Sequence, residues 1–120
     1  MKLSTTLKME EIAMFAGSIY LFTWTEYLWW VYPALFLLPD ISMLGYLINN
    51  KAGAIAYNIF HHKGIALILL LFGIWEGPDW MFLTGIILLG HASFDRILGY
   101  GLKYYDSFNH THLGMIGKVK

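Results

Sequence analysis

The chain has 120 residues, of which 58% are hydrophobic, 18% aromatic and only 13% charged, with a mean hydropathy of +0.54. Soluble domains usually carry about 25% charged residues, so this composition favours a membrane protein of a single domain. Eight basic residues balance eight acidic ones, which excludes a strongly basic surface, and we expect no nucleic-acid partner. The absence of cysteine excludes disulfides, thiol catalysis and Cys-ligated zinc, so any metal needs histidine, carboxylate or amide ligands.

The N-terminus starts with a short basic segment like that of a signal peptide. Glu10 and Glu11 follow it, however, and no small-residue cleavage site closes the apolar run, so we expect the segment to be retained. Thr5 or Thr6 is expected to cap a first helix over about residues 8–25, with Glu10 and Glu11 near its positive end.

A second apolar stretch covers about residues 27–48 and contains Pro33 and Pro39. Proline inside a helix removes a backbone hydrogen bond and its ring clashes with the preceding turn. The sequence therefore predicts a second helix that is kinked at Pro39 or broken.

A third helix is expected over about residues 52–75. Lys63 falls roughly midway along it, where its ammonium is far from water, so we expect either a helix distortion at Gly64 or a water-filled funnel. A Gly-Pro turn then leads to a fourth helix over about residues 80–98, and residues 99–120 form a polar tail.

Three or four membrane crossings are possible, depending on whether Glu26 marks a turn. With four crossings and the N-terminus inside, all basic residues near helix ends lie on the cytoplasmic side, as the positive-inside rule requires. The opposite side then holds Glu26, Glu76 and Asp79, with the tryptophans in one belt near its two turns. We therefore expect an all-α integral membrane bundle of four transmembrane helices in the bacterial inner (plasma) membrane, with both termini cytoplasmic. The cytoplasmic basic residues are Lys2, Lys8, Lys51, Arg96, Lys103, Lys118 and Lys120, and the tryptophans are Trp24, Trp29, Trp30, Trp75 and Trp80.

Ionisable residues within apolar segments are costly and mark candidate functional sites. At a rise of about 1.5 Å per residue, Asp40, Asn58 and His91 all lie about 10–12 Å from the cytoplasmic face. His61 is slightly deeper and Asp95 is shallower. Asn58 shares a helix face with His61, while His91 and Asp95 lie one turn apart on the fourth helix. We expect these faces to converge on one pocket that opens towards the cytoplasm.

The spacing of His91 and Asp95 is that of ligands on adjacent turns in helix-borne metal sites. We predict that His61, His91, Asp95 and Asp40 bind a divalent ion, zinc or manganese, in a small membrane-embedded hydrolase. Asp40, His91 and Asp95 are the predicted catalytic residues, with Asp40 as a ligand or a general base. The metal would activate water by lowering its pKa, and the substrate would be a lipid or another amphipathic molecule.

Three residues are predicted to bind the substrate: Asn58, Arg96 and His112. Asn58 would orient a ligand or the substrate, and Arg96 would receive an anionic head group. His112 would enter the mouth of the pocket if the tail folds back as a lid. Only one of His61 and His62 can point fully inward, and the sequence leaves open which.

Each of these side chains also has a structural interpretation. Asp95 could fix the tautomer of His91 or pair with Arg96, Asp40 could cap the helix that follows it, and Asn58 could make an interhelical hydrogen bond. The alternative function is a non-enzymatic membrane module. It would be a proton or small-solute carrier subunit, which would need a homo-oligomer, or an assembly partner whose polar cluster serves packing.

Four motifs stand out in the sequence: Pro39–Tyr46, Tyr57–His61, His91–Tyr104 and Thr111–Gly114. Together they resemble a family of short bacterial integral membrane proteins that is known only as a domain of unknown function. The resemblance covers about residues 10–117, implies a four-helix membrane fold and supplies no activity. A fainter resemblance is to bacterial membrane-bound metal-dependent hydrolases, which also place Pro-Asp after one helix and His and Asp ligands on later helices. This chain is shorter and lacks their second histidine-rich motif.

Overall fold

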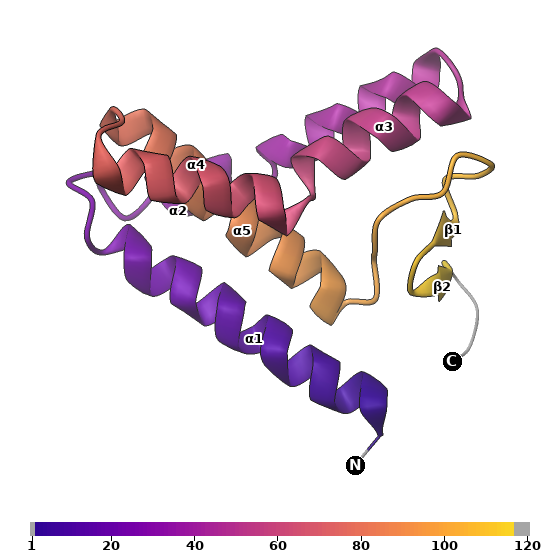
Figure 1. The fold of residues 1–120 in the computed structure, drawn as a ribbon, viewed down its shortest axis with the longest axis horizontal. Helices are drawn as coiled ribbons and strands as arrows, with labels where there is room; N and C mark the ends of the chain where they lie inside the picture. Colours follow the sequence, from indigo (N-terminus) through magenta and orange to yellow (C-terminus); the bar gives the residue numbers. More distant parts are fainter. Residues whose placement is uncertain (1, 117–120) are drawn as a thin grey trace.

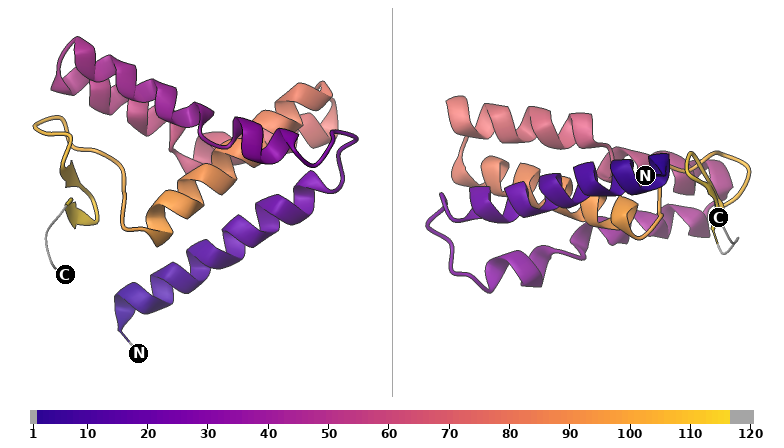
Figure 2. Two further views of the ribbon diagram at one scale, coloured as in Figure 1. Left: turned by 180° about the vertical axis from the view of Figure 1, so that it is seen from behind. Right: turned by 90° about the horizontal axis from the view of Figure 1, so that it is seen from below.

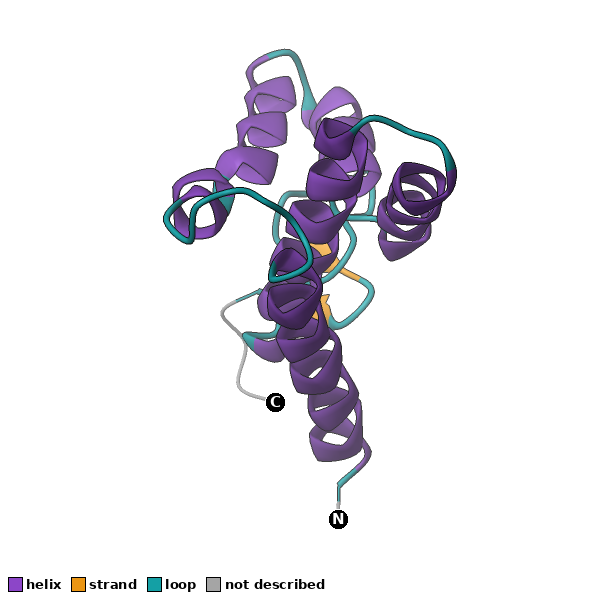
Figure 3. Cartoon of the chain, turned by 90° about the vertical axis from the view of Figure 1, so that its left-hand side faces the viewer, coloured by secondary structure: helices purple, strands orange, loops and turns teal. Residues whose placement is uncertain are grey.

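The structure, a computed structural model, describes residues 2–116 and is predominantly helical (Figures 1 and 3). The all-α class is confirmed, but the second and third predicted helices are each divided in two. Lys118 and Lys120, which were counted on the cytoplasmic side, lie outside the described residues. The elements are α1 (Leu3–Phe22), α2 (Val31–Leu35), the 3-10 helix η1 (Leu38–Leu47), α3 (Asn50–Phe60), α4 (Lys63–Trp75), α5 (Asp79–Ile97), β1 (His110–Thr111) and β2 (Gly114–Met115).

The helices form two groups that diverge at one end of the molecule. α5 packs between α1 and α4, while η1 packs against α3. The tail after α5, with the β1–β2 hairpin, lies in the angle between α3 and α5 in both views (Figures 1 and 2). The chain reverses direction after α1, after η1 and after α4. In Figure 1 the start of α1, the turn before α3 and the tail all lie towards the right, and the loops after α1 and α4 lie towards the left.

The second predicted helix is broken, which is one of the two outcomes expected from its prolines. α2 ends at Leu35, and η1 resumes at Leu38 with Pro39 in its first turn. Pro39 has no backbone N–H, and in a continuous α-helix its ring would clash with the carbonyl of Leu35. Asp40 lies inside the first turn of η1, whose N-cap is Leu37, so Asp40 does not cap this helix.

The third predicted helix breaks beside Lys63. α3 ends at Phe60, and the side chain of His62 caps α4 by accepting a hydrogen bond from the backbone N–H of Ile65 at 3.3 Å. The distortion expected at Gly64 therefore lies just before it. It lets the Lys63 ammonium bind the carboxylate of Glu11 on α1. Because α1 begins at Leu3, Glu11 lies in mid-helix rather than near the positive helix end.

One helical stretch within residues 2–116, Asn50–Trp75, is long and apolar enough by length and composition to cross a membrane. The stretch Val31–Leu47 is also apolar but shorter. Large exposed apolar side chains occur along α1, η1 and α4, and the five tryptophans are all exposed. An apolar surface of this extent needs a partner other than water.

Two glycines set the close approach of α4 and α5. A Cβ atom added to Gly85 would lie 2.7 Å from the Cα and 2.8 Å from the Cβ of Leu70, and one added to Gly73 would meet the backbone of Phe82. Each glycine therefore faces the backbone of the opposite helix. The buried core lies beside this crossing and consists of Phe22, Ala66, Leu70, Ile86 and Leu89.

Replacing Gly85 by alanine is expected to destabilise the protein by about 1–3 kcal/mol, because the backbone of Leu70 must move to admit the methyl group. Denaturant unfolding in detergent measures the change. Gly17→Ala is the matched control, since no described atom lies within 4 Å of its added Cβ. That control should be neutral or stabilising by about 0.5–1 kcal/mol through helix propensity. Equal stability of the two variants would contradict the close packing.

Candidate metal centre

The four residues predicted to bind a metal come together from three elements. Asp40 comes from η1, His61 follows the last residue of α3, and His91 and Asp95 lie on α5. One possible ligand atom of each side chain lies within 4.8 Å of all the others. The depths counted along the sequence thus correspond to a real cluster in space.

The separations within the cluster suit a divalent ion. His61 Nε2 lies 3.2 Å from Asp40 Oδ1 and 3.3 Å from Asp95 Oδ2, and His91 Nε2 lies 3.0 and 3.5 Å from the same two oxygens. Ligand atoms in a tetrahedral zinc site with bonds of about 2.0 Å are about 3.3 Å apart. Adjacent ligand atoms in an octahedral site with bonds of about 2.1 Å are about 3.0 Å apart. The four His–Asp distances are therefore close to the ligand spacing of either geometry, within a set of ligand atoms that lie up to 4.8 Å apart.

The second nitrogen of each imidazole faces a backbone carbonyl. His61 Nδ1 lies 2.8 Å from the oxygen of Tyr57, and His91 Nδ1 lies 2.7 Å from the oxygen of Phe36. A carbonyl oxygen only accepts hydrogen bonds, so both Nδ1 atoms carry a proton. In the neutral ring, each Nε2 then presents its lone pair to the two carboxylates. Histidines that bind metals are oriented in this way by a carbonyl behind the ring.

The cluster needs positive charge to balance its carboxylates. With both histidines neutral, Asp40 and Asp95 leave two negative charges beside side chains that are only 1% (His91) and 3% (His61) exposed. Buried charges of this kind must be paired or coordinated. One divalent cation would balance them, and so would one extra proton on each imidazole. Asp40 is 32% exposed and Asp95 13%, so Asp40 marks the open side of the cluster.

Tyr57 supports two members of the cluster and was not predicted from the sequence. Its hydroxyl donates a hydrogen bond to Asp95 Oδ2 at 3.0 Å. Its ring stacks on that of His61, with a centroid distance of 3.7 Å and an interplanar angle of 7°. In the sequence, its position one helical turn before His61 is the feature that could have predicted this contact.

On α5, Asp95 was expected either to fix the tautomer of His91 or to pair with Arg96. The tautomer of His91 is fixed through Nδ1 by the carbonyl of Phe36, not by Asp95. Arg96 makes no ion pair with a carboxylate among the described residues, and its Nη2 lies 3.5 Å from the carbonyl oxygen of His61. The long single contact leaves most of the donors of the Arg96 guanidinium available to an anion.

Asn58 holds the tail against α3. Its Nδ2 donates to the carbonyl of Lys103 at 2.8 Å, and its Oδ1 accepts from the N–H of Lys103 at 2.6 Å. The Lys103 ammonium lies 3.8 Å from the ring centroid of Phe108 and 4.6 Å from that of Tyr57. Burial lowers the pKa of Lys103 to about 8. Both polar atoms of the Asn58 amide are thus engaged by the tail backbone.

His112 also lies within the folded-back tail. Its Nδ1 accepts a hydrogen bond from the backbone N–H of Leu102 at 2.8 Å, so the ring supports the conformation of the tail itself. The tail lies beside α3 and α5 (Figure 2), and its role as a lid stays a prediction. A direct contact of His112 or Asn58 with a substrate stays a prediction.

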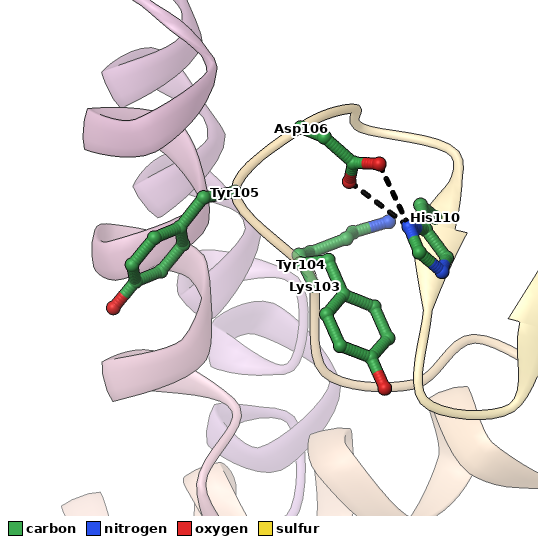
Figure 4. A pocket seen from close by; sticks show the side chains of 5 residues that line it. All are labelled: Lys103, Tyr104, Tyr105, Asp106 and His110. Atoms are coloured by element: carbon green, nitrogen blue, oxygen red, sulfur yellow. Dashed lines mark hydrogen bonds and ion pairs between the residues drawn. The ribbon is translucent and has the colours of Figure 1, made fainter.

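A hollow of about 400 Å³ lies in the tail (Figure 4). His110 Nδ1 lies 2.9 and 3.0 Å from the two carboxylate oxygens of Asp106, and this hydrogen bond lowers the pKa of Asp106. The two residues have the same spacing as His91 and Asp95, but they are more exposed, and the His110 ring also stacks on Tyr104 at a centroid distance of 4.1 Å. The hollow is lined by Lys103, Tyr104, Tyr105, Asp106 and His110.

The fold and the cluster define a small helical protein with a buried set of two histidines and two aspartates that could hold a metal ion. A family model described as a domain of unknown function, DUF4260, matches residues 4–116, and the chain belongs to this family. The resemblance to an uncharacterised family is thereby confirmed. Comparisons with curated proteins and with solved structures gave no match.

Proposed function

We propose that the protein is a small membrane-embedded hydrolase with a divalent metal, zinc or manganese, held at Asp40, His61, His91 and Asp95. One observation carries the proposal: both Nε2 atoms lie 3.0 and 3.2 Å from Asp40 Oδ1, while both Nδ1 atoms lie within hydrogen-bonding distance of backbone carbonyls. With both rings neutral, the two Nε2 lone pairs and the two carboxylates repel one another unless a cation lies between them.

The four residues of the cluster can take different roles in hydrolysis, as metal ligands or as a general base. His61, His91 and Asp95 are the more buried ligands, and three protein ligands leave one zinc position for water. The metal would lower the pKa of that water and polarise the scissile bond. Asp40, the most exposed member, is then placed to act as the general base that accepts the proton. With manganese, Asp40 can be a fourth ligand.

We propose a membrane location and an amphipathic or lipid substrate. Four crossings of the bacterial inner (plasma) membrane, with both termini cytoplasmic, agree with the reversals of the chain in Figure 1. The exposed apolar side chains and tryptophans support this location. Arg96 would receive an anionic head group. Asn58 and His112 would contribute to the substrate site from the tail that they fix in place.

Elemental analysis of detergent-purified protein without a histidine tag tests the metal centre. The parent protein is expected to hold about one divalent ion per chain, and a folded His91→Ala/Asp95→Ala variant only background metal. The matched control is Asp106→Ala/His110→Ala, which removes the same residue types at the same spacing from the tail and should retain the metal. Equal, negligible metal in parent and variant after incubation with zinc or manganese would overturn the proposal.

The second candidate is a non-enzymatic module: a proton or small-solute carrier subunit that forms a homo-oligomer, or an assembly partner. The distances of 3.0 and 3.2 Å between Asp40 and the two Nε2 atoms favour it, because protonated imidazoles could donate across them. In that case the parent protein holds no metal. Loss of His91 would then change proton flux or stability instead.

A further inference from the structure

A cavity of about 310 Å³ lies next to the metal centre. Its walls come from η1, the end of α3 and the middle of α5, and they are apolar apart from Thr84. The Thr84 hydroxyl already donates to the carbonyl of Trp80 in its own helix at 2.7 Å. A polar ligand would therefore find no free hydrogen-bond donor among the side chains of the lining.

The cavity and the metal centre share their supporting segments. Pro39, Phe60 and Ile87 line the cavity. Pro39 directly precedes Asp40, Phe60 directly precedes His61, and Ile87 lies one helical turn before His91 on the same face. Three of the four cluster residues thus have an immediate neighbour in the wall. The cavity therefore lies beside the segments that carry the cluster, and none of the four cluster side chains lines it.

We propose that this cavity binds a single aliphatic acyl chain of the substrate, with the acyl carbonyl end at the metal centre. The assignment rests on the proposed function and names its substrate class. Two observations favour an acyl chain: an apolar wall without free polar groups, and a polar cluster that could bind the adjoining carbonyl. Each methylene that enters such a cavity should tighten binding about fourfold, until the available volume is filled.

Alkyl hydroxamic acids of increasing chain length provide the test, because the hydroxamate binds metal and the chain probes the cavity. The protein is loaded with Co²⁺, whose visible absorption reports on coordination. The variant Thr84→Trp fills the cavity from α5, two turns from His91. The matched control Ile68→Trp adds the same side chain at an exposed position of α4 outside the lining.

Acetohydroxamate is expected to bind equally to the parent protein, Thr84→Trp and Ile68→Trp. Octanohydroxamate is expected to bind the parent and Ile68→Trp at least about tenfold more tightly than Thr84→Trp. Part of the probe partitions into the micelles, but this lowers the apparent affinity equally for all proteins because they are compared in one detergent. The ratio of affinities between variants is therefore unaffected. Leu38→Trp, which fills the cavity from η1 at an exposed position, should reproduce the loss if Thr84→Trp does not fold.

Failure of the acyl-chain site and failure of the metal centre give different results. If acetohydroxamate binds all proteins but the octanoyl chain adds the same affinity in the parent and in the filled variants, the acyl site is wrong and the metal centre stands. If the parent protein gives no cobalt spectrum, the metal centre is wrong and the acyl site falls with it.

Discussion

Loss of the Glu11 carboxylate in a Glu11→Ala variant is expected to lower the free energy of unfolding by about 3–5 kcal/mol. Glu11 is 11% and Lys63 18% exposed, and the Lys63 ammonium donates to both carboxylate oxygens of Glu11. Without Glu11, the sulfur of Met14 at 3.7 Å is the remaining hydrogen-bond contact of that ammonium among the described residues. Desolvation of an unpaired charge causes the loss.

Chemical unfolding in detergent measures this effect. Glu10→Ala is the control, because the neighbouring carboxylate is exposed and its removal should change stability by less than about 0.5 kcal/mol. Replacing both partners, as Glu11→Leu/Lys63→Met, should recover most of the loss, since an apolar pair of similar volume often equals a buried ion pair. A single variant as stable as Glu10→Ala would show that the pair does not hold α1 to α4.

Removal of the Tyr57 hydroxyl in Tyr57→Phe is expected to weaken binding of zinc about 10- to 100-fold. The phenyl ring keeps the stack on His61, whereas Asp95 Oδ2 loses its hydrogen-bond donor at 3.0 Å. Asp95 is then less firmly oriented towards the two imidazoles. Competition with a chromophoric chelator measures the dissociation constant.

Tyr46→Phe is the matched control for this experiment. The hydroxyl of Tyr46 is buried and has no hydrogen-bond partner among the described residues, so its removal should leave zinc affinity unchanged. If Tyr57→Phe binds zinc as tightly as Tyr46→Phe does, the hydroxyl does not support the metal centre.

The cluster could be predicted because depth along a helix depends mainly on residue count. Asp40, His61 and His91 were placed at similar depths from a common face, and this estimate tolerates local breaks in the helices. The choice between His61 and His62 could not be made in this way. It depends on the break after Phe60, where His62 caps α4 and Lys63 turns to Glu11.

The winding of η1 and the place of the tail also depend on tertiary contacts. Pro39 predicts an interruption, but the 3-10 helix that follows packs so closely on α3 that a Cβ on Gly45 would lie 2.9 Å from the carbonyl of Ala52. The tail has no periodic pattern to predict its position. Its contact with Asn58, which presents an amide to the Lys103 backbone as a neighbouring strand would, is visible only in three dimensions.

The absence of a backbone N–H on Pro39 accounts for the orientation of the His91 ring. In a 3-10 helix each carbonyl receives the N–H three residues later, and the residue three places after Phe36 is Pro39, which has none. The next N–H, that of Asp40, donates to Leu37 at 3.1 Å. The oxygen of Phe36 is thus left to accept the Nδ1–H of His91. The irregularity that interrupts one helix therefore sets which nitrogen of an imidazole on another helix is free to bind an ion.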